Sequence, residues 1–170
     1  PQVNANSLLT IAKNNLQTIT YPRPPEFHGT TFLKQLLVDL TNADSRLYLS
    51  VTAPAQEQLL PVLWQYLDQL HPYLWQQGKA FPSSAAEQLL LYQQSALSMA
   101  VSFNPNQWLK EKSTQQISET SERRYFTDGA ITNSHNLAIP KSAPSPEAAK
   151  VVINFMLSEK AQKEKFTGVW

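Results

Sequence analysis

Apolar residues return every three or four positions along much of this chain, the spacing with which a helix buries one face. Comparable stripes predict helices over residues 7–13, 31–40 and 85–92, and two more that open at Ser145 and Ser158. Before the third of these, Ser84 and Glu87 form a capping-box pattern. The clearest stripe of all consists of Leu59, Leu63, Tyr66, Leu67 and Leu70.

Prolines interrupt this helical pattern. Pro72 cannot lie in the middle of the long helix, so we expect a break near His71 and a short second helix that ends at Gly78. Pro61 lies either in the first turn of the long helix or at a kink. Aromatic residues at this spacing favour a packed core over a ligand cage, and they are Trp64, Tyr66 and Trp75.

Short β-competent runs alternate with the helices. Strands separated by helices are typical of a layered α/β domain. The predicted fold class is therefore α/β, with a small, largely parallel sheet flanked by helices. Residues 47–51 suit either a strand or a helical turn. The expected strands are residues 18–20, 79–81, 99–103 and 136–139.

Composition and charge narrow the function classes. The 170 residues suffice for one domain with a core. The net charge is +1 and no long basic run exists, which argues against nucleic acid as a partner. Arg123 and Arg124 stand near acidic residues and are interpreted as solvated loop charge. Because there are no cysteines, disulfides, thiolate metal sites and a cysteine nucleophile are excluded. No apolar run approaches the length of a membrane span.

Residues 21–32 form a proline-rich connection between a predicted strand and a predicted helix. Three prolines in four residues stiffen it, and Gly29 allows the backbone to approach a partner closely. Thr30 or Thr31 can cap the helix. A strand, a rigid polar loop and a helix N-terminus are the usual parts of a small-molecule site in α/β folds. They are also the parts of an ordinary βα connection, so both interpretations stay open for this stretch alone.

Loops that follow neighbouring parallel strands emerge at one edge of a sheet. Residues 21–31, 82–84 and 104–106 are three such loops, and residues 132–136 form a fourth candidate before a strand. They offer hydroxyls, carboxamides, a carboxylate, two imidazoles and aromatic faces, the mixture that a ligand pocket needs. Turn formation by Ser, Asn and Pro explains any single loop, so only the set of loops favours a binding site.

Catalytic and metal-binding patterns are lacking. The sequence has no Gly-x-Ser-x-Gly elbow, no His-Glu-x-x-His and no phosphate-loop glycine pattern, and its three histidines lack metal-ligand spacing. We therefore expect no catalytic residue, no metal and no cofactor.

Several runs carry a family resemblance. Two of them are residues 63–67, which read Leu-Trp-Gln-Tyr-Leu, and residues 81–88, which read Phe-Pro-Ser-Ser-Ala-Ala-Glu-Gln. Residues 20–33 read Thr-Tyr-Pro-Arg-Pro-Pro-Glu-Phe-His-Gly-Thr-Thr-Phe-Leu, and residues 99–106 read Met-Ala-Val-Ser-Phe-Asn-Pro-Asn. Residues 136–140, Asn-Leu-Ala-Ile-Pro, precede the last two predicted helices. Together these runs resemble the bacterial extracellular solute-binding proteins of ABC importers, and within them the subgroup of thiamine-transport binding proteins.

The resemblance implies the second lobe of a type II periplasmic-binding-protein fold over residues 1–135, with a linker at 107–128. Residues 136–170 would form a return strand and C-terminal helices that pack toward the first lobe. Complete members are longer, so we expect a carboxy-terminal portion of such a protein. The implied partners are a small-molecule solute, bound between two lobes in the periplasm, and an ABC-type membrane permease; the intact protein is expected to be a monomer. The loops and the resemblance together give these ligand-binding candidates: Tyr21, Glu26, His28, Gly29, Thr30, Thr31, Ser83, Ser84, Asn104, Asn106, Asn133 and His135.

Two other functions remain open. One is the ligand-sensing effector domain of a transcription regulator, which shares the two-lobed architecture. The other is an enzyme built on the same fold, for which Glu26, His28 and His135 are the acid or base candidates.

Overall fold

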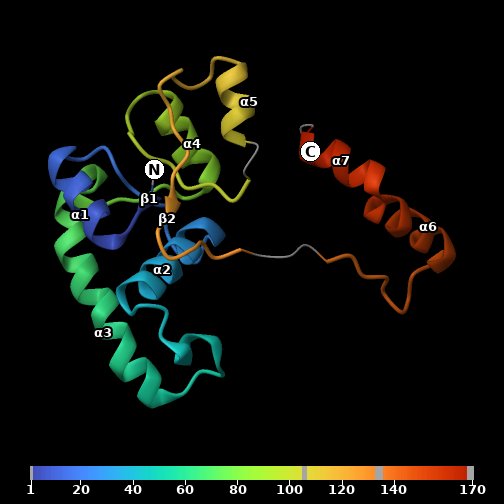
Figure 1. Cartoon of the computed structure of the whole chain (residues 1–170), viewed down its shortest axis with the longest axis horizontal. Coiled ribbons are helices and arrows are strands. Elements are labelled where there is room, and N and C mark those ends of the chain that lie inside the picture. Colours follow the sequence, from blue (N-terminus) through green and yellow to red (C-terminus); the bar gives the residue numbers. More distant parts are fainter. Residues whose placement is uncertain (1, 105–106, 133–135, 168–170) are drawn as a thin grey trace.

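The structure, a computed structural model, describes residues 2–104, 107–132 and 136–167. Helices dominate it, and Figure 1 shows α6 and α7 standing apart from the rest of the chain. In chain order the elements are β1 (Gln2–Val3), α1 (Ala5–Asn14), α2 (Phe27–Leu40), η1 (Ser45–Tyr48), α3 (Ala53–Leu70), η2 (His71–Tyr73), η3 (Trp75–Gly78), α4 (Ala85–Gln93), α5 (Gln107–Ser113), β2 (Tyr125–Phe126), α6 (Pro146–Leu157) and α7 (Glu159–Thr167), where η marks a 3-10 helix.

Two short strands pair in parallel although they lie far apart in the sequence. Gln2 aligns with Tyr125 and Val3 with Phe126. The Thr127 N–H extends the pairing by donating to the Val3 carbonyl at 2.9 Å. A helix-rich chain with a small parallel sheet confirms the predicted α/β class.

The positions expected for the strands are wrong, because strand occurs only in β1 and β2 within the described ranges. Residues 18–20 are held by separate segments instead of one partner strand. The Gln17 N–H donates to the Tyr73 carbonyl at 2.8 Å, and the Ser98 N–H donates to the Thr18 carbonyl at 2.7 Å. Prolines at positions 22, 72 and 82 lack an N–H and flank these segments, so the backbone hydrogen bonding cannot continue through those positions. The remaining ranges without strand are residues 79–81, 99–103 and 136–139.

Helix α2 begins four residues earlier than the expected start at residue 31. Its N-cap is Glu26, whose carboxylate accepts a hydrogen bond from the Gly29 N–H at 3.0 Å. Thr30 and Thr31 therefore lie inside the helix and do not cap it. A glutamate can take this role because a carboxylate near a helix N-terminus satisfies a free N–H and complements the helix dipole.

The core lies between α1, α2 and α3, where Leu8, Leu36 and Leu70 are almost completely buried. Burying one such side chain stabilises the fold by about 1.5–3 kcal/mol. The stripe predicted from Leu59 to Leu70 is buried as expected. The Tyr66 hydroxyl donates to the Ala5 carbonyl at 2.7 Å, which ties the start of α1 to α3.

The long helix ends as its prolines predict. Helix α3 ends at Leu70, and the short helix that contains Pro72 starts at His71. Gly78 closes the turn with a φ of +67°, and a Cβ there would lie 2.7 Å from the His71 carbonyl oxygen. Pro61 lies inside α3, not in its first turn. Trp64 is half-exposed, so its expected place in the core is wrong.

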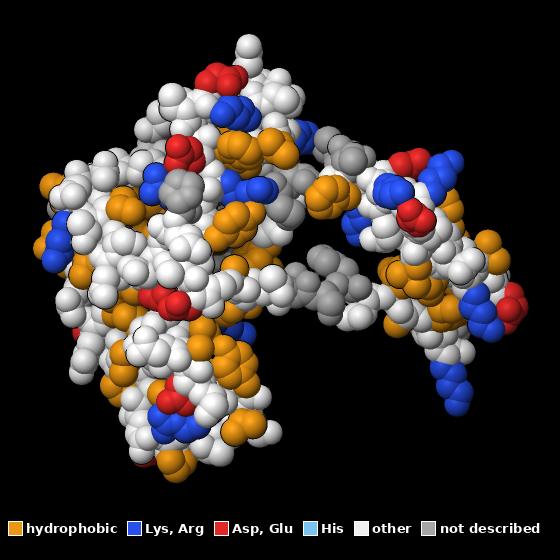
Figure 2. Space-filling model, in the orientation of Figure 1, with side chains coloured by type: hydrophobic (Ala, Val, Ile, Leu, Met, Phe, Trp, Pro, Cys, Tyr) orange, Lys and Arg blue, Asp and Glu red, His pale blue; other side chains and the backbone are white. Residues whose placement is uncertain are grey.

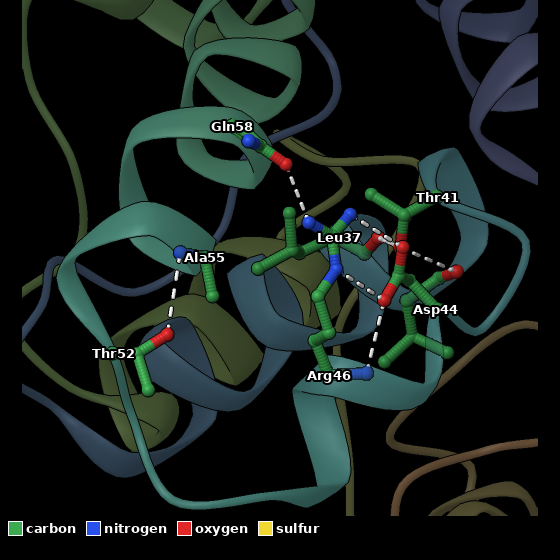
Figure 3. A network of polar contacts seen from close by, with 8 residues as sticks. Leu37, Thr41, Asp44, Arg46, Thr52, Ala55 and Gln58 are labelled. Atoms are coloured by element: carbon green, nitrogen blue, oxygen red, sulfur yellow. Dashed lines mark hydrogen bonds and ion pairs between the residues drawn. The ribbon is translucent and has the colours of Figure 1, made fainter.

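A network of polar contacts stabilises the connection between α2 and α3 (Figure 3). The Asp44 carboxylate caps η1 by accepting from the Arg46 N–H at 2.9 Å, and it also receives the Arg46 guanidinium. These hydrogen bonds from Arg46 lower the pKa of Asp44 to about 2. Arg46 also donates to the Gln58 side chain on α3. Of residues 47–51, for which a strand or a helical turn was expected, 47 and 48 belong to η1, and 49–51 lie in neither a helix nor a strand.

Helices α6 and α7 form as predicted, but they pack on each other and not on the core. No residue of α6 is buried, whereas Ala161 of α7 is enclosed. Figure 2 shows hydrophobic side chains on the surface of this pair. The division at residues 135 and 136 stays a prediction, and the linker expected at 107–128 contains both α5 and β2. The exposed apolar side chains of the pair are Val151, Val152, Phe155, Leu157 and Phe166.

Candidate functional site

Three of the polar loops meet at one place. The Arg23 N–H donates to the Pro82 carbonyl at 2.8 Å, which joins the loop before α2 to the loop before α4. The Phe103 ring lies 5.1 Å from both the Phe27 and the His28 rings, between ring centroids, which brings in the third loop. We call this assembly, residues 22–28, 82–84 and 102–104, the loop cluster.

Gln88 joins the segments that lead into two loops of the loop cluster, a role that was not predicted from the sequence. Its side chain is fully buried in α4. The Gln88 amide donates to the Thr20 carbonyl at 2.7 Å, and its oxygen accepts from the Val101 N–H at 3.1 Å. The Gln88 carboxamide therefore links Thr20 to Val101, two extended positions that are not paired as strands. A lone glutamine on a short amphipathic helix gives no sequence signal of this role.

Glu26 and His28 are the titratable pair of the loop cluster. Glu26 Oε1 lies 3.0 Å from His28 Nδ1, while Glu26 Oε2 accepts from the Gly29 N–H. Burial by itself raises the pKa of Glu26, but the hydrogen bonds from Gly29 and His28 outweigh it, so this pKa is lowered. Both side chains are about a quarter exposed, at 21% for Glu26 and 24% for His28. The pair presents a carboxylate and an imidazole to solvent beside aromatic rings.

Four of the predicted ligand-binding residues are enclosed by the protein. Tyr21 is buried, its hydroxyl lies 2.9 Å from His71 Nε2, and burial raises its pKa to about 12. Gly29 does permit a close approach, since a Cβ there would lie 1.7 Å from the Pro22 carbonyl oxygen. Thr31 is buried, and Thr30 Oγ1 is enclosed with no hydrogen-bond partner in the described ranges. These residues position the start of α2.

Ser83 and Ser84 stand at the start of α4, as the capping pattern predicts. Ser84 Oγ accepts from the Glu87 N–H at 3.1 Å. The Glu87 carboxylate accepts from Ser83, from its N–H at 2.7 Å and its hydroxyl at 2.6 Å. The hydrogen bond from the Ser83 hydroxyl is the main cause of the lowered pKa of Glu87.

Asn104 lies at the border between the loop cluster and a neighbouring pocket of about 420 Å³ between α4 and α5. This pocket was not predicted from the sequence, because residues 107–122 show little periodicity. Asn106, Asn133 and His135 lie outside the described residues. The residues that line the pocket are Leu89, Gln93, Asn104, Gln107, Lys110, Glu111 and Gln116.

A second hollow of about 460 Å³ lies between Trp108 of α5 and Tyr125 of β2. The Arg123 guanidinium carbon lies 5.9 Å from the Trp108 ring centroid and 5.2 Å from that of Tyr125. Arg123 is exposed in a loop, as its interpretation as solvated loop charge predicts, and it also packs against two aromatic faces.

Candidate metal-binding groups and membrane-spanning helices are both absent from the described ranges. These ranges contain no group of three His, Asp or Glu side chains that could hold a metal ion. None of their helices is both long and apolar enough to cross a membrane.

Comparison with known proteins identifies relatives. A family model described as bacterial extracellular solute-binding protein matches residues 20–163. Protein YnjB of Escherichia coli (strain K12) is 42% identical over 173 aligned residues, which cover 97% of this chain and 42% of YnjB. The chain thus spans less than half the length of this curated relative. No solved structure matches.

Proposed function

Because this chain belongs to the bacterial extracellular solute-binding protein family, we propose that it helps to capture a small solute outside the cytoplasm and to deliver it to an ABC-type membrane permease. In this proposal the loop cluster is one wall of the ligand cleft. The observation that carries the proposal is the meeting of three loops, distant in sequence, through the Arg23–Pro82 hydrogen bond and the Phe103 ring contacts. Rigid polar loops beside apolar walls are the usual composition of a small-molecule site.

The solute that fits this wall best is a cationic heteroaromatic compound such as thiamine. The Phe27 and Phe103 rings offer stacking surfaces, and the half-buried Glu26 carboxylate offers a negative charge next to them. The starts of α2 and α4 lie at the same place, although Glu26 and Ser84 already occupy part of their free N–H groups.

The role of the site is binding and not catalysis in this proposal. Both carboxylate oxygens of Glu26 are already hydrogen-bonded, one to the Gly29 N–H and one to His28, so Glu26 is a poor general base. Its lowered pKa keeps it a carboxylate at neutral pH, which suits the electrostatic attraction of a cation.

The test uses this chain alone, Protein YnjB, and a graft in which this chain replaces the matching part of YnjB. Each is titrated by calorimetry with thiamine, thiamine phosphate, putrescine and ferric iron. We expect YnjB and the graft to bind the same solute, with thiamine or its phosphate the tightest, and His28→Ala to weaken binding by the graft roughly tenfold. Glu57→Gln, an exposed change on α3, is the matched control and should leave binding unchanged.

Two results would count against this proposal. If a folded graft binds nothing that YnjB binds, the loop cluster is not a ligand wall. If thiamine compounds bind neither protein while another solute does, the capture role stands and the thiamine proposal is wrong.

A further inference from the structure

The pocket between α4 and α5 is lined by a buried residue, Glu111, whose carboxylate has no partner in the described ranges. Glu111 is 6% exposed. Its backbone is satisfied, because the Glu111 carbonyl accepts from the Gln116 N–H at 2.8 Å and from Thr114 Oγ1 at 3.3 Å. Its side chain, in contrast, makes no hydrogen bond and no ion pair within the described ranges.

The small accessible part of Glu111 includes its carboxylate. Two side-chain oxygens are enclosed without a partner in the described residues, Thr20 Oγ1 and Thr30 Oγ1, and neither belongs to Glu111. Since the Glu111 oxygens also lack a partner, they are reachable from the pocket that this residue lines. A carboxylate mostly removed from water and left unpaired is unfavourable unless a cation or donors meet it.

The rest of the pocket wall suits a polar ligand. Carboxamides of Gln93 and Gln116 face each other, with Nε2 and Oε1 3.5 Å apart. Ser102 Oγ donates to Gln107 Oε1 at 2.6 Å, which leaves the Gln107 amide hydrogens directed elsewhere. Lys110 is exposed and makes no ion pair in the part of the chain that the structure describes. The volume of about 420 Å³ is that of a small-molecule site.

We propose that this pocket binds a small protonated amine, whose ammonium group pairs with the Glu111 carboxylate while the carboxamides of α4 and α5 bind its polar remainder. Lys110 then gives the pocket a higher affinity for an amino acid than for a diamine, because it attracts the carboxylate of an amino acid and repels the second charge of a diamine. This site adjoins the loop cluster at Asn104, but it does not rest on the proposed function.

The experiment titrates the full chain with L-glutamine, with putrescine and with 1,4-butanediol, the neutral counterpart of putrescine. Calorimetry gives affinity, and NMR of the side-chain amide groups of Gln93, Gln107 and Gln116 gives the location. We expect saturable binding of at least one amine with shifts of these amide signals, and no binding of the diol. Glu111→Gln should weaken the binding roughly tenfold to a hundredfold.

Control variants separate the alternatives. Glu57→Gln makes the same charge change on the exposed side of α3 and should leave the affinity unchanged. His28→Ala in the loop cluster should also leave it unchanged, so failure of this site and failure of the loop cluster are distinguishable. Lys110→Gln should weaken glutamine and spare or strengthen putrescine.

The proposal is overturned if no amine binds, if the diol binds as well as putrescine, or if Glu111→Gln binds as the unaltered chain does. A thermal melt of Glu111→Gln guards against a folding artefact. The Glu111→Gln substitution nearly preserves the shape of the side chain and removes its charge, so the melting temperature of this variant should not fall below that of the unaltered chain. If it falls, Glu111→Ala in the same amide NMR titration replaces it, and unchanged amine binding by that variant overturns the proposal.

Discussion

Leu36 in α2 and Phe155 in α6 both lie in helices with apolar residues at helical spacing, yet they end in opposite environments. Leu36 is completely buried between α1, α2 and α3, whereas Phe155 is 52% exposed. The difference does not lie in the helices, since both form as the spacing predicts. It lies in whether a second apolar surface of the described chain covers the stripe, because a helix gains most of its stability from packing.

The largest expected effect is in the three-helix core. Leu36→Ala should lower the free energy of unfolding by about 2–5 kcal/mol, because it removes buried methyl groups and leaves a cavity. Urea denaturation followed by circular dichroism measures this loss. A loss below about 1 kcal/mol would mean that the core can collapse around the smaller side chain.

Gly29→Ala comes next, at the junction between the core and the loop cluster. The new Cβ would overlap the Pro22 carbonyl oxygen, at 1.7 Å, so α2 must move away from the loop. We expect a loss of about 1–3 kcal/mol in the free energy of unfolding, typical of overpacking. The comparison change is Ala53→Gly at the exposed start of α3, which should cost less. Equal losses for both would contradict the close approach.

The pH dependence of the free energy of unfolding should distinguish His71, which follows α3, from His28 in the loop cluster. Burial lowers the pKa of His71 below 6.5, and Asp68 only partly opposes this. The unfolded chain therefore binds the proton more readily than the folded one. The stability linked to His71 is complete above pH 6.5 and declines as the pH falls below that value.

The measurement is the urea midpoint between pH 8 and pH 5, for the unaltered chain and for His71→Gln. The variant should show a weaker decline over this window. His28→Gln is the control, and an equal change in slope in both variants would show that His71 has no special part.

The smallest effect is expected in the α6–α7 pair. Phe155→Ala should change the free energy of unfolding by no more than about 0.5 kcal/mol, as surface substitutions usually do. Urea denaturation under the conditions used for Leu36→Ala gives a direct comparison. A loss approaching that of Leu36→Ala would show that the apolar face of α6 is covered in solution.

The sequence predicted helices well where local rules suffice. The stripe from Leu59 to Leu70, the break at His71 and the Ser84 cap follow from spacing, proline chemistry and capping, which act within a few residues. The loops of the candidate site were also found, because turn residues between apolar runs are visible in sequence. Which residues of those loops are accessible was not visible, and Tyr21 is the example: an apparent ligand residue that the core encloses.

Taken alone, the sequence determined most of the helices, the break at His71, the Ser84 cap, and membership of a family whose model matches residues 20–163. Only the tertiary structure decided where the extended segments bond, that Gln88 joins Thr20 to Val101, and that the Glu111 side chain lies beside a pocket without a partner in the described ranges. The physical reason is the separation along the chain of the residues that interact. Helix propensity and capping depend on neighbours along the chain, whereas burial and hydrogen-bond satisfaction depend on segments that meet only after folding.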